Sequence, residues 1–141
     1  MMEHLSWRGD GYSNRRSPDS RRPQGLYRCG RFHCDRDAGV LFEETERTLF
    51  CSDLFHQVGD LEPLTSADVV GRSHQALKEY QAGILAEYVP YTPLTAHNLK
   101  KLAELNPKTL AMMHSSSFTG DCARALDDLN VVLREVFGPP K

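Results

Sequence analysis

The sequence lacks the features that would place it in a membrane or on a secretory route. No stretch approaches the ~18 consecutive apolar residues that a membrane helix needs, and Met1–Gly11 holds no apolar run typical of a signal peptide. Cysteine is scarce, with four residues in 141, and cytosolic thiols stay reduced by default. We therefore expect a cytoplasmic protein that does not cross a membrane.

Several common catalytic and cofactor-binding patterns are also missing. There is no glycine-rich phosphate loop of either common kind and no flavin-binding motif. Ser115–Ser117 follows His114 directly, but no Gly-x-Ser-x-Gly elbow is present, and adjacent residues rarely act as nucleophile and base. Cys29, His33 and Cys34 are clustered as zinc ligands often are, yet no fourth ligand stands at a suitable spacing. We interpret that cluster as chance.

Lysine is absent from the first 36 residues, which hold eight arginines against four acidic residues. The remainder of the chain holds nine basic and fifteen acidic residues. The segment 1–36 is rich in Arg, Ser, Gly and Pro and shows no periodicity, which predicts a disordered tail. The pairs Arg15–Arg16 and Arg21–Arg22 would suit a nucleic-acid-binding arm, but lysine and regularly interleaved aromatics are missing. We expect no nucleic-acid partner.

Residues 37–138 show the pattern of one α/β (α+β) domain. Apolar runs at 38–43 and 48–51 around a polar turn predict a β-hairpin. A helix over about 67–81 would be capped by Thr65 or Ser66, and a second, from Pro93 to about Leu105, by Thr92. A strand over 109–113 and an amphipathic helix running from Gly120–Asp121 to Phe137 complete the order β-β-α-α-β-α.

Two polar residues stand where predicted strands end. Asp53 comes just after the strand 48–51, and His114 closes the strand 109–113. In layered α/β folds, ligands and metals collect at strand ends. A carboxylate can bridge two divalent ions, and neutral imidazole suits iron and zinc alike. Taken singly, an Asp after a strand is more often a turn residue and a lone His more often structural, so the pair matters more than either member.

The segments TLFCSDLF (48–55) and LNPKTLAMMHSSSFTGD (105–121) resemble elements of the metallo-β-lactamase superfamily. The flavodiiron-like, oxygen-binding di-iron branch is the most similar. The resemblance covers 37–138 and implies half of an αββα sandwich. It also implies that Asp53 bridges two metal ions and that His114 is the last metal ligand. His33 precedes Asp53 by 20 residues, near the place of the family's middle His ligand, but the expected Pro/Gly context is absent.

The family's leading His-x-His/Glu-x-Asp ligand cluster is absent from this sequence. Relatives carry a two-metal centre of iron or zinc and act as metallohydrolases or di-iron oxidoreductases. This chain therefore resembles a partial or degenerate metalloprotein, truncated and weakly active or inactive alone. The alternative is a non-enzymatic α/β interaction module without a metal centre.

Two further expectations follow from the resemblance and the sequence. With half of the sandwich missing, an apolar sheet face would be exposed, which predicts a homo-oligomer or a partner chain that covers it. His56, His74 and His97 fall in predicted loops or helices and are expected to be surface groups. Asp60 would either orient a ligand imidazole or be an ordinary loop charge.

Overall fold

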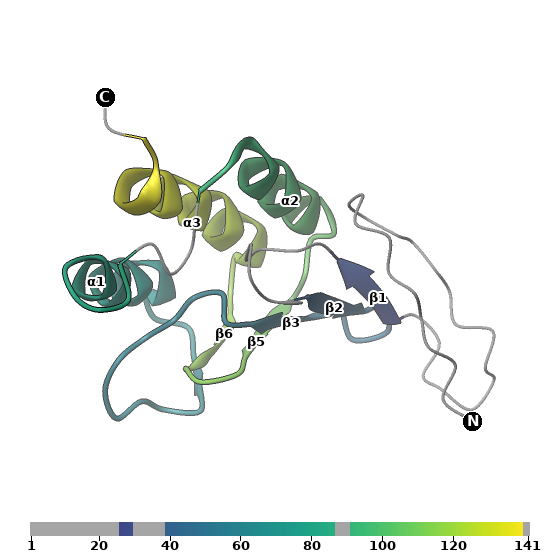
Figure 1. Cartoon of the computed structure of the whole chain (residues 1–141). Helices are drawn as coiled ribbons and strands as arrows, with labels where there is room; N and C mark the ends of the chain where they lie inside the picture. The colour runs from purple at the N-terminus through teal and green to yellow at the C-terminus, as the bar shows by residue number, and fades with distance from the viewer. Residues whose placement is uncertain (1–25, 30–38, 87–90, 140–141) are drawn as a thin grey trace, which may run out of the picture.

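The computed structural model describes residues 26–29, 39–86 and 91–139, which form a mixed sheet with helices packed on one of its faces (Figure 1). The strands are β1 Leu26–Cys29, β2 Val40–Glu43, β3 Thr48–Ser52, β4 Leu64–Thr65, β5 Thr109–Met112 and β6 Ser117–Thr119. Their spatial order is β1-β2-β3-β5-β6-β4. The helices are α1 Val69–Gln81, α2 Pro93–Glu104 and α3 Cys122–Phe137. A mixed sheet with one helical layer is an α/β architecture, so the predicted α/β class is confirmed.

The hairpin of β2 and β3 forms where the sequence predicts it, with Glu43 opposite Thr48. The Glu43 carboxylate accepts hydrogen bonds from the backbone N–H groups of Thr45 (2.6 Å) and Glu46 (2.8 Å). These bonds, the one from Glu46 foremost, lower the pKa of Glu43. Arg47 closes the turn with a φ of 56°. The polar residues between the two apolar runs thus supply the turn that the pattern predicts.

Strand β5 lies beside β3 and runs parallel to it, with Leu49 opposite Leu110. Parallel neighbours need a long crossover connection, and here helices α1 and α2 lie within it. Because the two strands point the same way, the residues that follow them leave the sheet at the same edge. This topology brings the segment after β3 close to the segment after β5.

Helix α1 begins later than the sequence predicts. Asp68, not Thr65 or Ser66, is the capping residue, and its side chain accepts a hydrogen bond from the backbone N–H of Gly71 at 2.8 Å. Thr65 instead ends strand β4, and its hydroxyl accepts from the N–H of Ala67. Three residues capable of capping stand in four positions of this stretch, and the pairing of Thr65 with β6 decides which one serves.

Helices α2 and α3 begin where the sequence places them. Thr92 caps α2, Pro93 occupies its first turn, and Thr95 completes a reciprocal capping box with Thr92. Asp121 caps α3 by accepting from the N–H of Arg124 at 3.0 Å. None of the described helices has the length and apolar character that crossing a membrane requires.

Three strands have no counterpart in the expected order. Strands β4 and β6 have two and three residues, too few for an alternating pattern to be recognised. Strand β1 pairs with β2 and lies within the segment 1–36, for which composition predicts no structure. The backbone groups of β1 find hydrogen-bond partners in β2, and such pairing does not depend on the side-chain composition from which the prediction was made. Residues 1–25 and 30–38 lie outside the described residues, so the tail there stays a prediction.

The two faces of the sheet differ in burial. On β2 and β3, Val40, Phe42, Leu49 and Cys51 are buried and belong to the core that helix α3 completes. The alternate residues Leu41 and Phe50 sit opposite each other in the register and are 43% and 46% exposed. In Figure 1 the three helices lie together on one side of the sheet.

Candidate metal centre

Asp53 lies in a tight turn directly after β3. The flanking residues Ser52 and Phe55 have φ values of 51° and 57°, and the N–H of Leu54 donates to the carbonyl of Cys51 at 3.1 Å. Positive φ is costly for residues other than glycine, and such conformations cluster at functional sites. The register between β3 and β5 also shifts between Phe50 and Ser52. The chain therefore leaves the sheet at Asp53 in a constrained conformation, with the carboxylate side chain 21% exposed.

His114 stands two residues after β5, at the same edge of the sheet. The N–H of Met113 donates to the carbonyl of Ser52 at 3.3 Å, which extends the contact between the two strands by one residue. The His114 side chain is 60% exposed, and its Nε2 lies 3.6 Å from Oδ1 of Asp53. The structure thus brings together the two residues that the sequence singles out, although a helical crossover separates them along the chain.

The separation of these two atoms suits ligands of one metal ion. Two ligand atoms bound at about 2.0–2.2 Å to a tetrahedral ion are about 3.4 Å apart, close to the 3.6 Å between His114 and Asp53. The same contact is an ion pair when the imidazole is protonated. Within the described ranges, however, no group of three or more His, Cys, Asp or Glu residues is arranged to hold a metal ion. The pair fits part of a metal centre and not a whole one.

His33, the third predicted ligand, lies outside the described residues, and so do Cys34 and the arginine pairs of the tail. Its position relative to Asp53 and His114 therefore stays a prediction. Asp60 is an exposed loop residue. The structure gives it no contact with either member of the pair.

His56 is the residue near the pair that the sequence analysis did not select. It is partly buried, not a fully exposed surface group. Its ring centroid lies 6.0 Å from that of His114 and 5.2 Å from that of Tyr80, which it meets edge-on. Its place three positions after Asp53, directly after the same turn, is the signal that could have drawn attention to it. His74, by contrast, lies on α1 and contacts Glu135 at 3.2 Å.

The cysteine nearest to Asp53 in sequence is unsuited to metal binding. Cys51 lies on β3 with its side chain in the core, 0% exposed. Burial, with a smaller contribution from Cys122, raises the pKa of the Cys51 thiol well above its usual range. The thiolate is the form that binds metals and attacks electrophiles. Oxygen and imidazole donors are therefore what this edge of the sheet offers.

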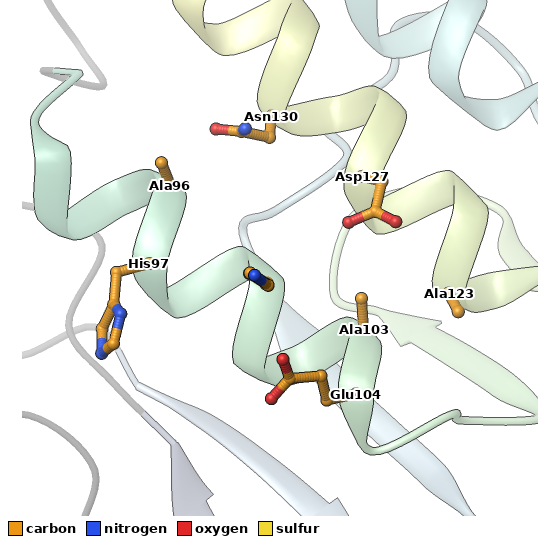
Figure 2. Close-up of a pocket in the computed structure, with 8 residues that line it drawn as sticks. Ala96, His97, Ala103, Glu104, Ala123, Asp127 and Asn130 are labelled. Atoms are coloured by element: carbon orange, nitrogen blue, oxygen red, sulfur yellow. The ribbon is translucent and has the colours of Figure 1, made fainter.

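A groove of about 490 Å³ between α2 and α3 lies away from the pair (Figure 2). Its lining residues come from these two helices: Ala96, His97, Lys100, Ala103, Glu104, Ala123, Asp127 and Asn130. None belongs to the turns that carry Asp53 and His114. The groove is therefore separate from the candidate site at Asp53 and His114.

Comparison with known proteins gives a fold and no family. No protein-family model matches the sequence, and neither does any curated protein. The apo state of the chemotaxis sensor ODP from T. denticola has a TM-score of 0.51 at 17% identity, over 74% of this chain and 43% of that chain. A peroxy diiron species of chemotaxis sensor ODP has a TM-score of 0.52 at 18% identity, over 74% of this chain and 44% of that chain. This chain therefore shares the fold of part of ODP, and spans less than half the length of the ODP chains it matches.

Proposed function

We propose that this chain contributes ligands to a metal centre of the metallo-β-lactamase fold, in the flavodiiron-like branch, with Asp53 and His114 as those ligands. The observation that carries the proposal is the 3.6 Å contact between His114 Nε2 and Asp53 Oδ1 at the ends of two parallel strands. By itself the chain would be a weakly active or inactive metalloprotein, because the pair supplies too few donors.

Three features support a ligand role for this pair over a chance contact. The strand-end position is the place where α/β folds hold ligands. The turn at Asp53 is held by two residues with positive φ, a conformation that costs free energy and persists where the surrounding structure enforces it. The fold is that of part of ODP, one structure of which is a peroxy diiron species.

The residues of this chain would take different parts in such a centre. The two carboxylate oxygens of Asp53 allow it to bridge two ions, whereas His114 donates one nitrogen to one ion. A pair of metal ions bound there would supply Lewis-acid activation of water or of an oxygen substrate. The remaining ligands would come from outside the described residues, with His33 as one candidate. Iron and zinc both suit this donor set.

The second candidate function is a non-enzymatic interaction module that keeps the fold without a metal. Among the described residues no group of three metal-binding side chains is arranged as a site, and this observation favours the alternative. In that case the contact between Asp53 and His114 would be an ion pair at the sheet edge. Exposed ion pairs of this kind contribute about 0–1 kcal/mol.

Metal content separates the two functions. In purified wild-type protein we expect iron or zinc at up to one or two equivalents by elemental analysis, and loss of the metal in Asp53→Ala and in His114→Ala. Loss of a group that only orients a metal ligand typically lowers metal affinity about 10–100-fold. Each of these substitutions removes a ligand itself, so the affinity should fall by at least that much. His97→Ala, which removes an exposed histidine on α2, is the matched control and should keep the metal.

Circular dichroism of all four proteins is the companion measurement, since loss of metal counts only in a folded variant. A folded wild type without metal would favour the interaction module. Equal loss of metal in His97→Ala would show that binding is not specific to the pair.

We further propose that, in the purified protein, a second copy of this chain covers the outer face of the sheet. The outer face is the side opposite the helices, on which Leu41 and Phe50 are exposed. Leu41 and Phe50 form an apolar pair across β2 and β3 on that face, each more than two-fifths exposed. Neighbouring exposed apolar side chains mark interaction surfaces more often than isolated ones do.

Sedimentation velocity tests this surface. The wild type should self-associate as its concentration rises. The double variant Leu41→Lys, Phe50→Lys should stay monomeric, because association through this face would bury the two introduced charges. The control places the same charges on exposed helical positions, Leu94→Lys and Val131→Lys, and should associate like the wild type. A wild type that stays monomeric at all concentrations would contradict self-association.

A further inference from the structure

The sheet alone does not hold Asp53 beside His114. The pairing of β3 with β5 ends at Ser52 and Met112, and one more backbone bond, from Met113 to Ser52, follows. Both candidate ligands lie beyond these last contacts, in turns of their own. Contacts beyond the strand ladder therefore contribute to the distance between them.

Gln57 joins the two turns. Its backbone N–H donates to the hydroxyl of Ser115 at 3.0 Å. Its side-chain Nε2 donates to the carbonyl of Ser116 at 3.2 Å and to the carbonyl of Phe55 at 3.3 Å. One residue thus bonds to its own turn and to the two residues that directly follow His114. The amide orientation is defined, because Nε2 faces two carbonyl acceptors.

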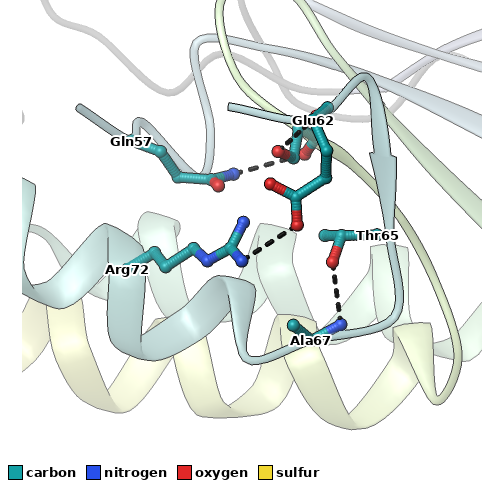
Figure 3. Close-up of polar contacts among 6 residues, drawn as sticks. Gln57, Glu62, Thr65, Ala67 and Arg72 are labelled. Atoms are coloured by element: carbon teal, nitrogen blue, oxygen red, sulfur yellow. Dashed lines mark hydrogen bonds and ion pairs between the residues drawn. The ribbon is translucent and has the colours of Figure 1, made fainter. Parts of the chain in front are cut away.

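A second set of bonds ties the far end of the same loop. The hydroxyl of Ser116 donates to the carbonyl of Glu62 at 2.6 Å, and the N–H of Ser117 donates to the carbonyl of Pro63 at 3.0 Å. The Glu62 carboxylate accepts from Nη2 of Arg72 on α1 at 2.9 Å (Figure 3). This bond, together with smaller contributions that include a hydrogen bond from Thr65, lowers the pKa of Glu62 to about 2.

The two side-chain bonds of Gln57 are shielded from water, and its backbone bond to Ser115 is partly buried. Gln57 is 5% exposed and Ser116 is 1% exposed. A buried polar group that loses its partner keeps its full desolvation cost, so this arrangement resists opening. Such a contact specifies one geometry more strictly than an exposed hydrogen bond does.

We propose that Gln57 is a positioning residue that clamps the turn after β3 to the turn after β5 and so holds Asp53 within reach of the ion that His114 binds. This inference rests on the proposed function, since it assigns Gln57 a role in the same site. Gln57 does not contact the metal. It acts through the backbone of both turns, with Ser115 and Ser116 as its partners.

Two variants break the clamp from opposite sides. Gln57→Met keeps the length of the side chain but removes the Nε2 donor, and Ser115→Ala removes the hydroxyl that accepts from the Gln57 backbone. Tyr91→Phe is the control. It removes the hydrogen bond that the Tyr91 hydroxyl donates to Asn130 (3.0 Å) and the one that it accepts from Nε of Arg134 (3.2 Å), side-chain bonds that involve neither turn.

The first readout needs no metal. Amide hydrogen exchange of Met113 and Ser117, measured by NMR on the apo protein, should speed up at least about tenfold in both clamp variants and not in Tyr91→Phe. The amides of Leu49 and Leu126, in the core, should be unchanged in all three. Unchanged exchange at Met113 and Ser117 in the clamp variants would overturn the proposal, whatever happens to metal binding.

The second readout is the affinity for Zn²⁺, from competition with a chromophoric chelator. Both clamp variants should bind Zn²⁺ about 10–100-fold more weakly than the wild type, the range found for groups that orient metal ligands, while Tyr91→Phe binds normally. Faster exchange with unchanged Zn²⁺ affinity would overturn the positioning role. A wild type that binds no Zn²⁺ would refute the proposed function and with it the positioning role. Faster amide exchange in the two clamp variants would still establish that Gln57 clamps the turns.

Discussion

Replacing Leu110 by alanine is expected to lower the free energy of unfolding by about 3 kcal/mol. Leu110 is 0% exposed on β5 and stands opposite Leu49, also 0% exposed, on β3. Truncating a buried leucine removes its transfer free energy and leaves a cavity, which together cost about 2–5 kcal/mol. Few packed atoms can move to fill this space, because the neighbouring strand is bonded in a fixed register. Urea denaturation followed by circular dichroism measures the change.

The matched control is Leu94→Ala, which makes the same chemical change at a residue that is 51% exposed on α2. It should cost less than about 1 kcal/mol, because exposed positions rarely contribute more. Similar losses at Leu94 and Leu110 would contradict the core described above. They would mean either that α2 is covered on its outer side or that β5 is not packed as the structure has it.

Elements long enough to show a period were predictable from the sequence. The apolar runs at 38–43 and 48–51 around a polar turn predicted the hairpin of β2 and β3. Thr92–Pro93 predicted the start of α2, because a capping side chain and a fixed φ are local properties. The amphipathic pattern of α3 extends over 16 residues, so its one-sided burial was evident. In each case the signal lies within one element.

The parts that could not be predicted depend on contacts between distant segments. Strands β4 and β6 pair with each other, and neither is long enough to form alone. The choice of Asp68 over Thr65 as the cap of α1 follows from that pairing. Local preference among good capping residues is nearly equal, so tertiary contacts decide.

The candidate site also has a part that could be predicted from the sequence and a part that could not. Asp53 and His114 each stand after a recognisable strand, and the parallel arrangement of those strands brings them together. Their role as metal ligands stays a prediction. The bonds of Gln57 to Ser115 and Ser116 cross 58 and 59 positions, and nothing in the local sequence marks a glutamine as the partner of a distant serine. A residue that acts through such bonds becomes visible only in three dimensions.

Cys51 and Cys122 are expected to react with iodoacetamide at least about 100-fold more slowly in the native protein than in the unfolded chain. They are 0% and 1% exposed. Burial raises the pKa of both thiols, which reduces the population of the reactive thiolate. Reaction then requires an opening of the structure, and a 100-fold protection corresponds to an opening free energy of about 2.7 kcal/mol. Mass spectrometry of the peptides that contain Cys51 and Cys122 measures the two rates separately.

The control is a small free thiol alkylated with and without urea, which corrects for the effect of denaturant on the reagent. Rapid labelling of Cys51 in the native protein would contradict the structure, because Cys51 lies on β3 two positions before Asp53. A strand that opens readily there could not hold the Asp53 turn in its positive-φ conformation or keep the carboxylate near His114. Protection at Cys51 is therefore a requirement of the metal centre as well as of the core, and it can be tested before any metal is added.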